Sequence, residues 1–354
     1  MSVRGPSNLQ YRHVQITPRR GNTLLISRAF DVESACPMNS DTPSRPVAGP
    51  TPQQRRLRQA ALAAIIVNVG IVFTGGLVRV TGSGLGCPDW PTCDGPSLVP
   101  VPGSEHAGWQ AAIEFGNRLL TFVVLAAVIA VWVQVRRTRP HSRQVELLAW
   151  FLPAGVAFQA ILGGVTVLTG LHPLTVAGHF LASMALIFAA VLLHDRVSRP
   201  PRYEPVGTGL RHATTALAAV AMAVMALGTI VTGAGPHGGD VSAPRLPVDI
   251  RIAALAHADA VWLLVGLTIA LVVVTWRHPS RRLRVGLRVL LAIEIAQGAL
   301  GYAQYALGIP NTLVALHILG AALMWTAASA VWARAHPLPN PELDGTGPVE
   351  PVSQ

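Results

Sequence analysis

Eight apolar stretches run along the chain, and each is close to the ~20 residues that an α-helix needs to cross the ~30 Å hydrocarbon core of a bilayer. A segment inside a bilayer must satisfy its own backbone hydrogen bonds, so these stretches are expected to be helices. Only 12% of the 354 residues are charged, whereas 51% are hydrophobic, a balance unusual for a soluble domain. The sequence therefore predicts an all-α integral membrane protein with eight transmembrane helices, at about 60–80, 111–134, 146–169, 174–193, 213–233, 252–275, 285–307 and 311–333.

The net charge of +10 comes from arginines that gather in short links between the apolar stretches. This pattern indicates membrane topology rather than nucleic-acid binding. The segment before the first stretch and the links after the second, fourth and sixth are rich in arginine, whereas the alternate links carry few, with Arg245 and Arg251 as the main exceptions. Arginine-rich links stay in the cytoplasm, so both termini are predicted to be cytoplasmic in a multi-pass protein of the plasma membrane.

Both ends of the chain are predicted to be disordered tails. Residues 1–54 are rich in Ser, Pro and Arg and contain no apolar run long enough for a signal peptide, so we expect a disordered cytoplasmic tail there. Met38 offers a second start of translation within it. Residues 337–354 are rich in Pro, Gly and acidic side chains and are expected to form the other tail.

The membrane region contains an internal repeat. Residues 159–186 (QAILGGVTVLTGLHPLTVAGHFLASMAL) align without a gap with residues 297–324 (QGALGYAQYALGIPNTLVALHILGAALM) at a shift of 138 positions. The coinciding residues include Gln159 and Gln297, Gly163 and Gly301, Gly170 and Gly308, and His179 and His317. In both copies a tight turn containing Gly and Pro separates two apolar stretches. The repeat predicts two pseudo-symmetric four-helix bundles, residues 55–205 and 206–336, that enter the membrane in the same direction.

Polar side chains are predicted to share one depth in these bundles. The second, fourth, sixth and eighth helices all run inward, and each carries a polar residue five or six positions from its outer end, which is roughly 8–9 Å. Ionisable groups inside a span are costly and usually mark a functional site. The residues of this layer are Glu114 with Asn117 and Arg118, then His179, then His257 with Asp259, and then His317.

The histidines of the second half, His257 and His317, fall on two helices of one bundle, which is how four-helix bundles ligate haem iron through two imidazoles. The matching positions of the first half hold Asn117 and His179, so one strong ligand remains there. A hydrogen bond to a neighbouring helix is the alternative for each histidine taken singly. Zinc would need three or four close ligands, and each half offers at most two of these histidines, so haem is favoured.

Two cysteines, Cys87 and Cys93, lie in the first predicted outward loop, residues 82–108. An oxidising exterior favours a disulfide between them. Two unpaired thiols or a metal site are the alternatives, but the loop contains no second cysteine pair and only one distant histidine.

The first outward turn, residues 76–93 (GLVRVTGSGLGCPDWPTC), resembles the signature of the haem A synthase family. Further similarities lie in IEFGNR at 113–118, GPHGGD at 235–240, HAD at 257–259 and both copies of the repeat. The resemblance implies an oxidoreductase that converts the C8 methyl of haem O to a formyl group through hydroxylated intermediates, giving haem A for cytochrome c oxidase.

The resemblance also implies which residues form the sites. The iron of a haem b cofactor in the second half would be held by His257 and His317, and the substrate haem O would bind in the first half. Its iron would take His179 as one ligand and Asn117 or water as the other, because Asn117 stands where the family has a histidine.

Glu114 is the expected catalytic proton carrier; its alternative role is an ion pair with Arg118 one turn along the same helix. Arg79 and Arg118 are expected to contact haem propionates. The implied partners are haem O synthase and the cytochrome c oxidase assembly machinery, and an oligomer is compatible with the sequence. A non-catalytic bis-histidine membrane cytochrome that carries electrons and a repeat-built transporter are the remaining alternatives.

Overall fold

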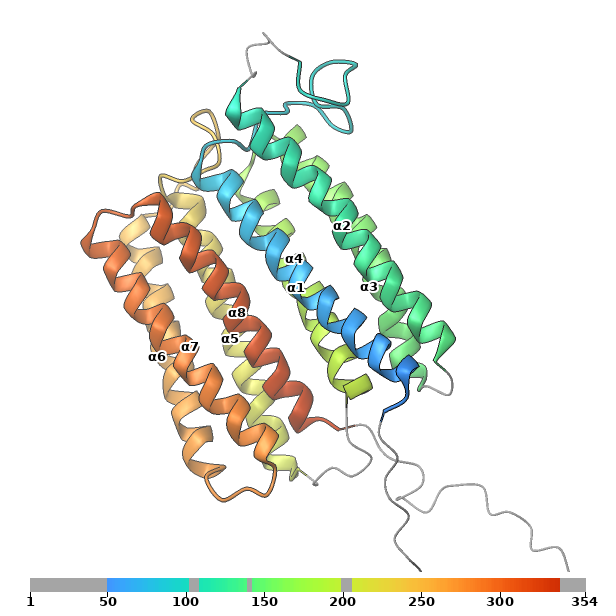
Figure 1. The fold of residues 1–354 in the computed structure, drawn as a ribbon. Helices are drawn as coiled ribbons and strands as arrows, with labels where there is room; N and C mark the ends of the chain where they lie inside the picture. The colour runs from blue at the N-terminus through green and yellow to red at the C-terminus, as the bar shows by residue number, and fades with distance from the viewer. Residues whose placement is uncertain (1–49, 102–107, 139–141, 199–205, 338–354) are drawn as a thin grey trace, which may run out of the picture. The chain divides into compact units, whose positions relative to one another are not determined.

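The computed structural model describes residues 50–101, 108–138, 142–198 and 206–337. These residues form eight α-helices, and the only β-pairing among them is an isolated bridge between Asp94 and Ser97. The helices are α1 (Pro52–Val80), α2 (Trp109–Arg137), α3 (Arg143–Leu168), α4 (Pro173–Ser198), α5 (Thr208–Ala234), α6 (Ile250–Val274), α7 (Arg281–Ala306) and α8 (Asn311–Ala335). Successive helices run antiparallel (Figure 1), and the all-α prediction is confirmed.

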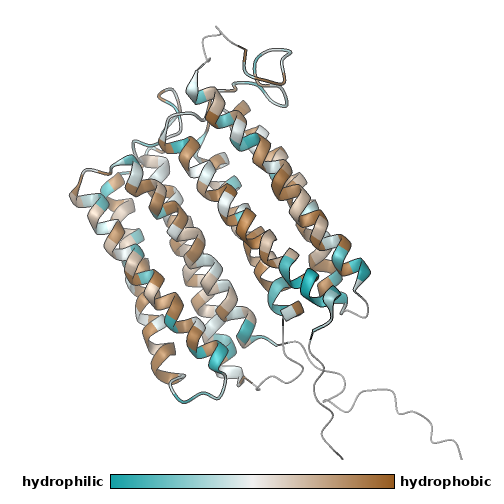
Figure 2. Ribbon diagram, viewed as in Figure 1, coloured by the Kyte–Doolittle hydropathy of each residue, from teal (hydrophilic) through white to brown (hydrophobic). Residues whose placement is uncertain are grey.

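Seven of the eight described helices are long and apolar enough to cross a membrane, and α7 is the exception. Helix α7 carries Arg288 and Glu294 inside the stretch predicted to span. Figure 2 shows hydrophobic residues along most of the helix lengths and hydrophilic residues gathered mainly toward the helix ends. The prediction of membrane-spanning length is therefore confirmed for seven helices, and for α7 it stays a prediction.

Large apolar side chains cover the outside of the helices. The exposed fraction is 67% for Phe122, 62% for Trp262 and 66% for Val273. Apolar surface as continuous as this would favour aggregation in water, whereas lipid tails accept it at no cost. The outer surface is therefore suited to a bilayer.

Three central helices, α1, α4 and α8, connect two rings of four. Helices α1 to α4 pack in ring order, and so do α5 to α8; between the rings α1 and α4 contact α8, and α4 contacts α5. In the most apolar part of α1, α4 and α8, 44% of the residues are buried, against 17–28% in α2, α3, α5 and α6. The central helices are therefore covered by protein, and the outer helices carry most of the apolar surface.

The two copies of the repeat have the same local structure. Helices α3 and α7 both have 26 residues, and each is followed by a glycine in the left-handed region, Gly170 (φ 61°) or Gly308 (φ 74°). The next residue, Leu171 or Ile309, also has a positive φ of 59°, and its N–H donates to the carbonyl five residues earlier. These bonds satisfy carbonyls at the helix ends, and the tight turns predicted from sequence are confirmed.

The first helix begins inside the segment predicted to be a tail. The Thr51 hydroxyl accepts from the Gln54 N–H at 3.2 Å, and the Thr51 N–H donates to the Gln54 side chain at 3.0 Å. This capping box starts α1 at Pro52. The predicted tail, residues 1–54, therefore extends too far, because its last residues belong to α1. The rest of that tail, with Cys36 and Met38, and residues 338–354 of the other tail lie outside the described residues.

Candidate functional site

The four polar positions predicted to share one depth lie in the second turn of their helices. Glu114, His179, His257 and His317 are the sixth, seventh, eighth and seventh residues of α2, α4, α6 and α8. Because successive helices are antiparallel, these four helices begin at the same end of the bundle (Figure 1). The structure therefore brings the four residues to similar distances from one end.

The repeated histidines, His179 and His317, occupy matching environments. The Gln159 side-chain amide donates to the carbonyl of His179 at 3.1 Å, and the Gln297 amide donates to the carbonyl of His317 at 2.9 Å. The Nδ1 atoms of both imidazoles are buried without a hydrogen-bond partner in the described part of the chain. Within the described residues these Nδ1 atoms therefore do not make the interhelical bond that was the alternative role of each histidine.

Glycines make room for these two imidazoles. A Cβ atom at Gly163 would lie 3.4 Å from Cε1 of His179, and a Cβ atom at Gly301 would lie 3.6 Å from Cε1 of His317. Each ring thus packs close to the backbone of the preceding helix. The repeated glutamine and glycine together form a frame for one histidine in each half.

The remaining histidine of the layer, His257, is oriented by α5. Its Nδ1 lies 3.1 Å from the carbonyl oxygen of Val224, so Nδ1–H donates there and Nε2 keeps its lone pair. A Cβ atom at Gly228 would lie 3.2 Å from Cε1 of this ring, which holds the imidazole closely. His257 and His317 lie on helices of the same ring, α6 and α8.

These two imidazoles fit the requirements of a haem with two axial histidines. They come from α6 and α8 of one helix ring, one is oriented through Nδ1, and the other has no competing hydrogen bond to its ring. Among the described residues no group of three or more His, Cys, Asp or Glu is placed to hold a metal ion by itself. A bis-histidine haem needs only two protein ligands, so the donor set suits haem better than a metal ion alone.

The first half differs at Asn117. Its Oδ1 accepts a hydrogen bond from the Thr74 hydroxyl of α1 at 2.7 Å, and a Cβ atom at Gly75 would lie 3.9 Å from its Nδ2. The amide is therefore tied to the neighbouring helix. The first half pairs the framed His179 with an amide that already has a partner.

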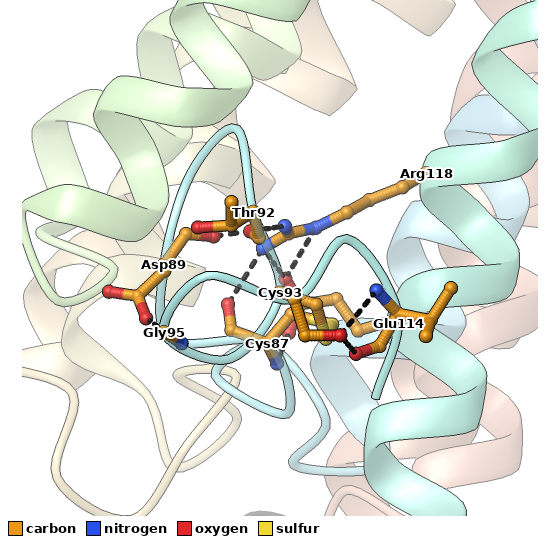
Figure 3. The surroundings of a disulfide bond; sticks show 9 residues. Cys87, Asp89, Thr92, Cys93, Gly95, Glu114 and Arg118 are labelled. Carbon is orange, nitrogen blue, oxygen red and sulfur yellow. Dashed lines mark hydrogen bonds and ion pairs between the residues drawn. A yellow bond between two sulfur atoms is a disulfide. The ribbon is translucent and has the colours of Figure 1, made fainter. Parts of the chain in front are cut away.

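The carboxylate of Glu114 is buried beneath the loop that contains Cys87 and Cys93, called here the disulfide loop (Figure 3). Cys87 and Cys93 form a disulfide, which confirms the prediction. Oε2 of Glu114 accepts from the Cys87 N–H at 2.8 Å, and Oε1 accepts from Nε and Nη2 of Arg118 at 3.1 and 2.7 Å. The carboxylate thus joins α2 to the loop, and the ion pair predicted as its alternative role is present.

All five N–H donors of Arg118 are used within the protein. Besides its two bonds to Glu114, Nη1 donates to the carbonyls of Asp89 and Thr92 at 2.9 and 2.8 Å, and Nη2 donates to that of Cys87 at 2.7 Å (Figure 3). A guanidinium has five N–H groups, so none remains for a haem propionate. The loop folds over the guanidinium and takes these donors, and the expected propionate contact of Arg118 stays a prediction.

Arg79, by contrast, keeps free donors. Its Nε donates to the carbonyl of His237 at 2.6 Å and its Nη2 to that of Thr232 at 2.9 Å, which links α1 to the end of α5. Arg79 forms no ion pair with a described carboxylate. Its guanidinium therefore keeps its positive charge and some of its N–H donors available where the halves meet.

Residues 58–237, about half of the chain, match the family model described as cytochrome oxidase assembly protein. The chain belongs to this family. The chain is similar to three proteins named haem A synthase. The protein from Lysinibacillus sphaericus is 38% identical over 140 residues, which cover 39% of this chain and 44% of that protein. The protein from Shewanella oneidensis is 28% identical over 181 residues (48% of this chain and 53% of that protein), and the one from Symbiobacterium thermophilum is 30% identical over 283 residues (74% of this chain and 89% of that protein). The chain spans about half the length of the first two relatives.

As a member of this family with seven apolar helices of spanning length, the chain is a multi-pass membrane protein. The match to the family includes the disulfide loop, Glu114, Asn117 and His179, and it ends before His257. The recognition of this family from the first outward turn is confirmed.

Sequence reasoning missed two hydrogen bonds. One joins Thr74 to Asn117, and the other, which is buried, joins Thr268 to Glu294. Glu294 gave a signal, because it is an acid inside an apolar stretch. The threonines gave none, since a hydroxyl in a helix can bond to its own backbone.

Proposed function

We propose that this protein is a haem A synthase of the plasma membrane, which oxidises the C8 methyl of haem O to a formyl group through hydroxylated intermediates and so supplies haem A for cytochrome c oxidase. The observation that carries the proposal is the asymmetry between two matching histidine frames. Both halves present one framed imidazole, and the second half adds His257 where the first half has Asn117. The shared name of the relatives favours this activity over an electron-carrying cytochrome or a transporter.

In this proposal all eight helices span the membrane as two pseudo-symmetric bundles, with α7 crossing despite Arg288 and Glu294 and with both termini in the cytoplasm. The support is the identical length of α3 and α7 and the matching turns that follow them. The layer of Glu114 and the histidines then lies toward the exterior, in the same half of the membrane as the disulfide loop.

The second half would hold haem b through His257 and His317. When bound, this group would supply one-electron transfer. The Val224 carbonyl fixes the tautomer of His257, and the backbone beside Gly228 and Gly301 fixes the planes of the two rings. These residues keep both Nε2 atoms oriented for ligation.

The first half would hold the substrate haem O, with His179 as its strong ligand. Asn117 is a weak ligand whose oxygen is already bonded to Thr74. A haem with one strong protein ligand dissociates more readily than one with two, which suits a substrate that must enter and a product that must leave.

Glu114 would carry a proton away from the reacting methyl group. Its Oε1 accepts two hydrogen bonds and its Oε2 accepts one, so Oε2 keeps a lone pair that can bind a proton. Arg118 and the N–H of Cys87 position this carboxylate. Arg79 is the residue left to contact a propionate, through the donors that its bonds to carbonyls do not use.

Haem O synthase would deliver the substrate, and the assembly machinery of cytochrome c oxidase would receive the product; an oligomer is compatible with this role. The test is to express the full chain in cells that make haem O but no haem A and to extract the haems. We expect haem A to appear. Haem O alone beside a low-spin haem b spectrum would indicate the electron carrier instead, and a folded protein without haem would indicate the transporter.

A further inference from the structure

The second half contains a buried polar pair on the α6–α7 contact. Glu294 is 3% exposed, and its Oε1 accepts a hydrogen bond from the hydroxyl of Thr268 at 2.9 Å. Its Oε2 is buried and has no hydrogen-bond partner among the described residues. None of the ion pairs in the described chain includes Glu294.

Both residues of the pair point into the ring of helices that contains the two histidines. Thr268 follows His257 by eleven residues, or three helical turns, so the two side chains lie on one face of α6. Glu294 precedes Gln297 by three residues and therefore shares the face of α7 that frames His317. The offset along α6 between Thr268 and His257 is roughly 16 Å at 1.5 Å per residue.

The first half shows that the fold does not need a polar pair here. In the first half, the residue equivalent to Glu294 by the repeat shift is Val156. The residue equivalent to Thr268, by the offset between Asn117 and His257, is Val128. These valines are 4% and 0% exposed, so apolar side chains fill the same place. Burying a carboxyl group with an unpartnered oxygen destabilises a protein, so the pair is better explained by a role than by packing.

We propose that Glu294 is a redox-linked proton site of the second half: its carboxylate binds a proton from the medium more tightly when one electron enters the haem held by His257 and His317. This inference rests on the proposed function, because it needs haem b at these histidines. The electron adds one negative charge to the iron site, and this charge makes protonation of the carboxylate more favourable. On oxidation the electron leaves, and the carboxyl group releases its proton more readily. Thr268 holds the carboxyl in place through Oε1.

The neighbours of Glu294 do not supply an alternative charge. Helix α7 packs against α6 and α8. The titratable groups on these helices are Arg251, His257 and Asp259 on α6, Arg281, Arg282, Arg284, Arg288, Tyr302 and Tyr305 on α7, and His317 and Arg334 on α8. Asp259 is exposed, and the guanidinium of Arg288 lies over the ring of Trp276 at 5.1 Å. Glu294 is therefore the buried acid on the α6–α7 contact.

The test is the midpoint potential of haem b in the purified full chain, measured with chemical mediators from pH 5 to 9. At an effective dielectric constant of about 20 and a separation of ~16 Å, a unit charge changes the redox equilibrium about sixfold, which is about 45 mV for one electron. We expect the potential of the wild type to fall by about this amount as pH rises. Glu294→Gln, which stays neutral, should remain near the low-pH value throughout.

Glu146→Gln is the matched control, because Glu146 is an acid at the start of α3 that pairs with Arg136 away from the histidines; it should keep the wild-type slope. If Glu294→Gln loses haem, Glu294→Val, which copies Val156 of the first half, replaces it in the measurement. A wild-type potential independent of pH, or an equal slope in wild type and the Glu294 variant, overturns the inference. Absence of haem b from the wild type would instead overturn the proposed function.

Discussion

The first and second halves hold their repeated histidines in the same way and differ in what surrounds them. Each half has a glutamine bonded to the histidine carbonyl and a glycine against the ring. The first half then adds the carboxylate of Glu114 under a disulfide loop and the bonded amide of Asn117, whereas the second adds His257 and a buried acid. In the proposed function this duplicated frame holds an exchangeable haem in the first half and a retained haem in the second, and a few surrounding side chains make the difference.

The largest expected effect tests whether the retained haem belongs to the second half. His257→Ala or His317→Ala should abolish the low-spin b-type spectrum of the purified protein, because each removes one of two iron ligands. His179→Ala is the matched control and should keep the spectrum, as its ring lies in the equivalent frame of the other half. Absorption spectra of the three variants decide the point, and an unchanged spectrum in both second-half variants would refute the assignment.

The next effect tests whether chemistry belongs to the first half. Glu114→Ala should lower conversion of haem O by about 10²–10⁴-fold, the usual contribution of a positioned proton-transfer group, and His179→Ala should act similarly by removing the substrate ligand. The readout is the haem A, haem O and hydroxylated intermediate content of extracts, with Glu146→Ala as the control. Normal haem A in both variants would mean that the first half is not the reaction site.

A smaller effect is expected at the disulfide loop. Replacing Cys87 and Cys93 by Ser should lower conversion about tenfold, because the loop that donates the Cys87 N–H to Glu114 loses about 2 kcal/mol of chain restraint. The haem b spectrum should not change. Mass spectrometry of the wild type should find neither cysteine alkylated before reduction; two free thiols, or equal loss of haem b, would contradict this prediction.

Asn117→His should make the halves more alike. The new imidazole would replace a weak ligand by a strong one, so we expect haem O to dissociate about tenfold more slowly while the protein still folds. Gly75 leaves space beside residue 117, since even a Cβ atom added at Gly75 would lie 3.9 Å from Nδ2 of Asn117. Release of haem O to an acceptor protein measures the effect, and faster release than in the wild type would argue against iron ligation at this position.

The smallest expected effect separates two glycines of the second half. An added methyl at Gly228 would lie 3.2 Å from His257 and must displace the ring, whereas one at Gly301 would lie 3.6 Å from His317 in ordinary contact. Gly228→Ala should therefore destabilise the folded state by about 1 kcal/mol and alter the haem b spectrum slightly. Gly301→Ala serves as its control in thermal unfolding, and equal shifts in both would show that the close contact has no consequence.

Much of the architecture could be predicted because it depends on local patterns. Apolar stretches of spanning length predicted the helices, and the repeated Gly and Pro positions predicted the two matching turns. The position of Cys87 and Cys93 in one outward loop, on the oxidising side of the membrane, predicted their disulfide. The gap-free repeat also predicted that His179 and His317 would be equivalent, and the structure gives them the same contacts. These features follow from periodicity and turn chemistry along short segments of chain.

The tertiary structure alone decided the contacts between segments that are far apart in the chain. The sequence by itself determined that Arg118 lies one turn from Glu114, but the loop carbonyls that take its remaining donors come from residues 87–92, brought there by the fold of the loop. Likewise, Thr74 reaches Asn117 and Thr268 reaches Glu294 only because of how each helix is rotated about its axis. That rotation is set by the packing of many side chains at once, and no single stretch of sequence contains it.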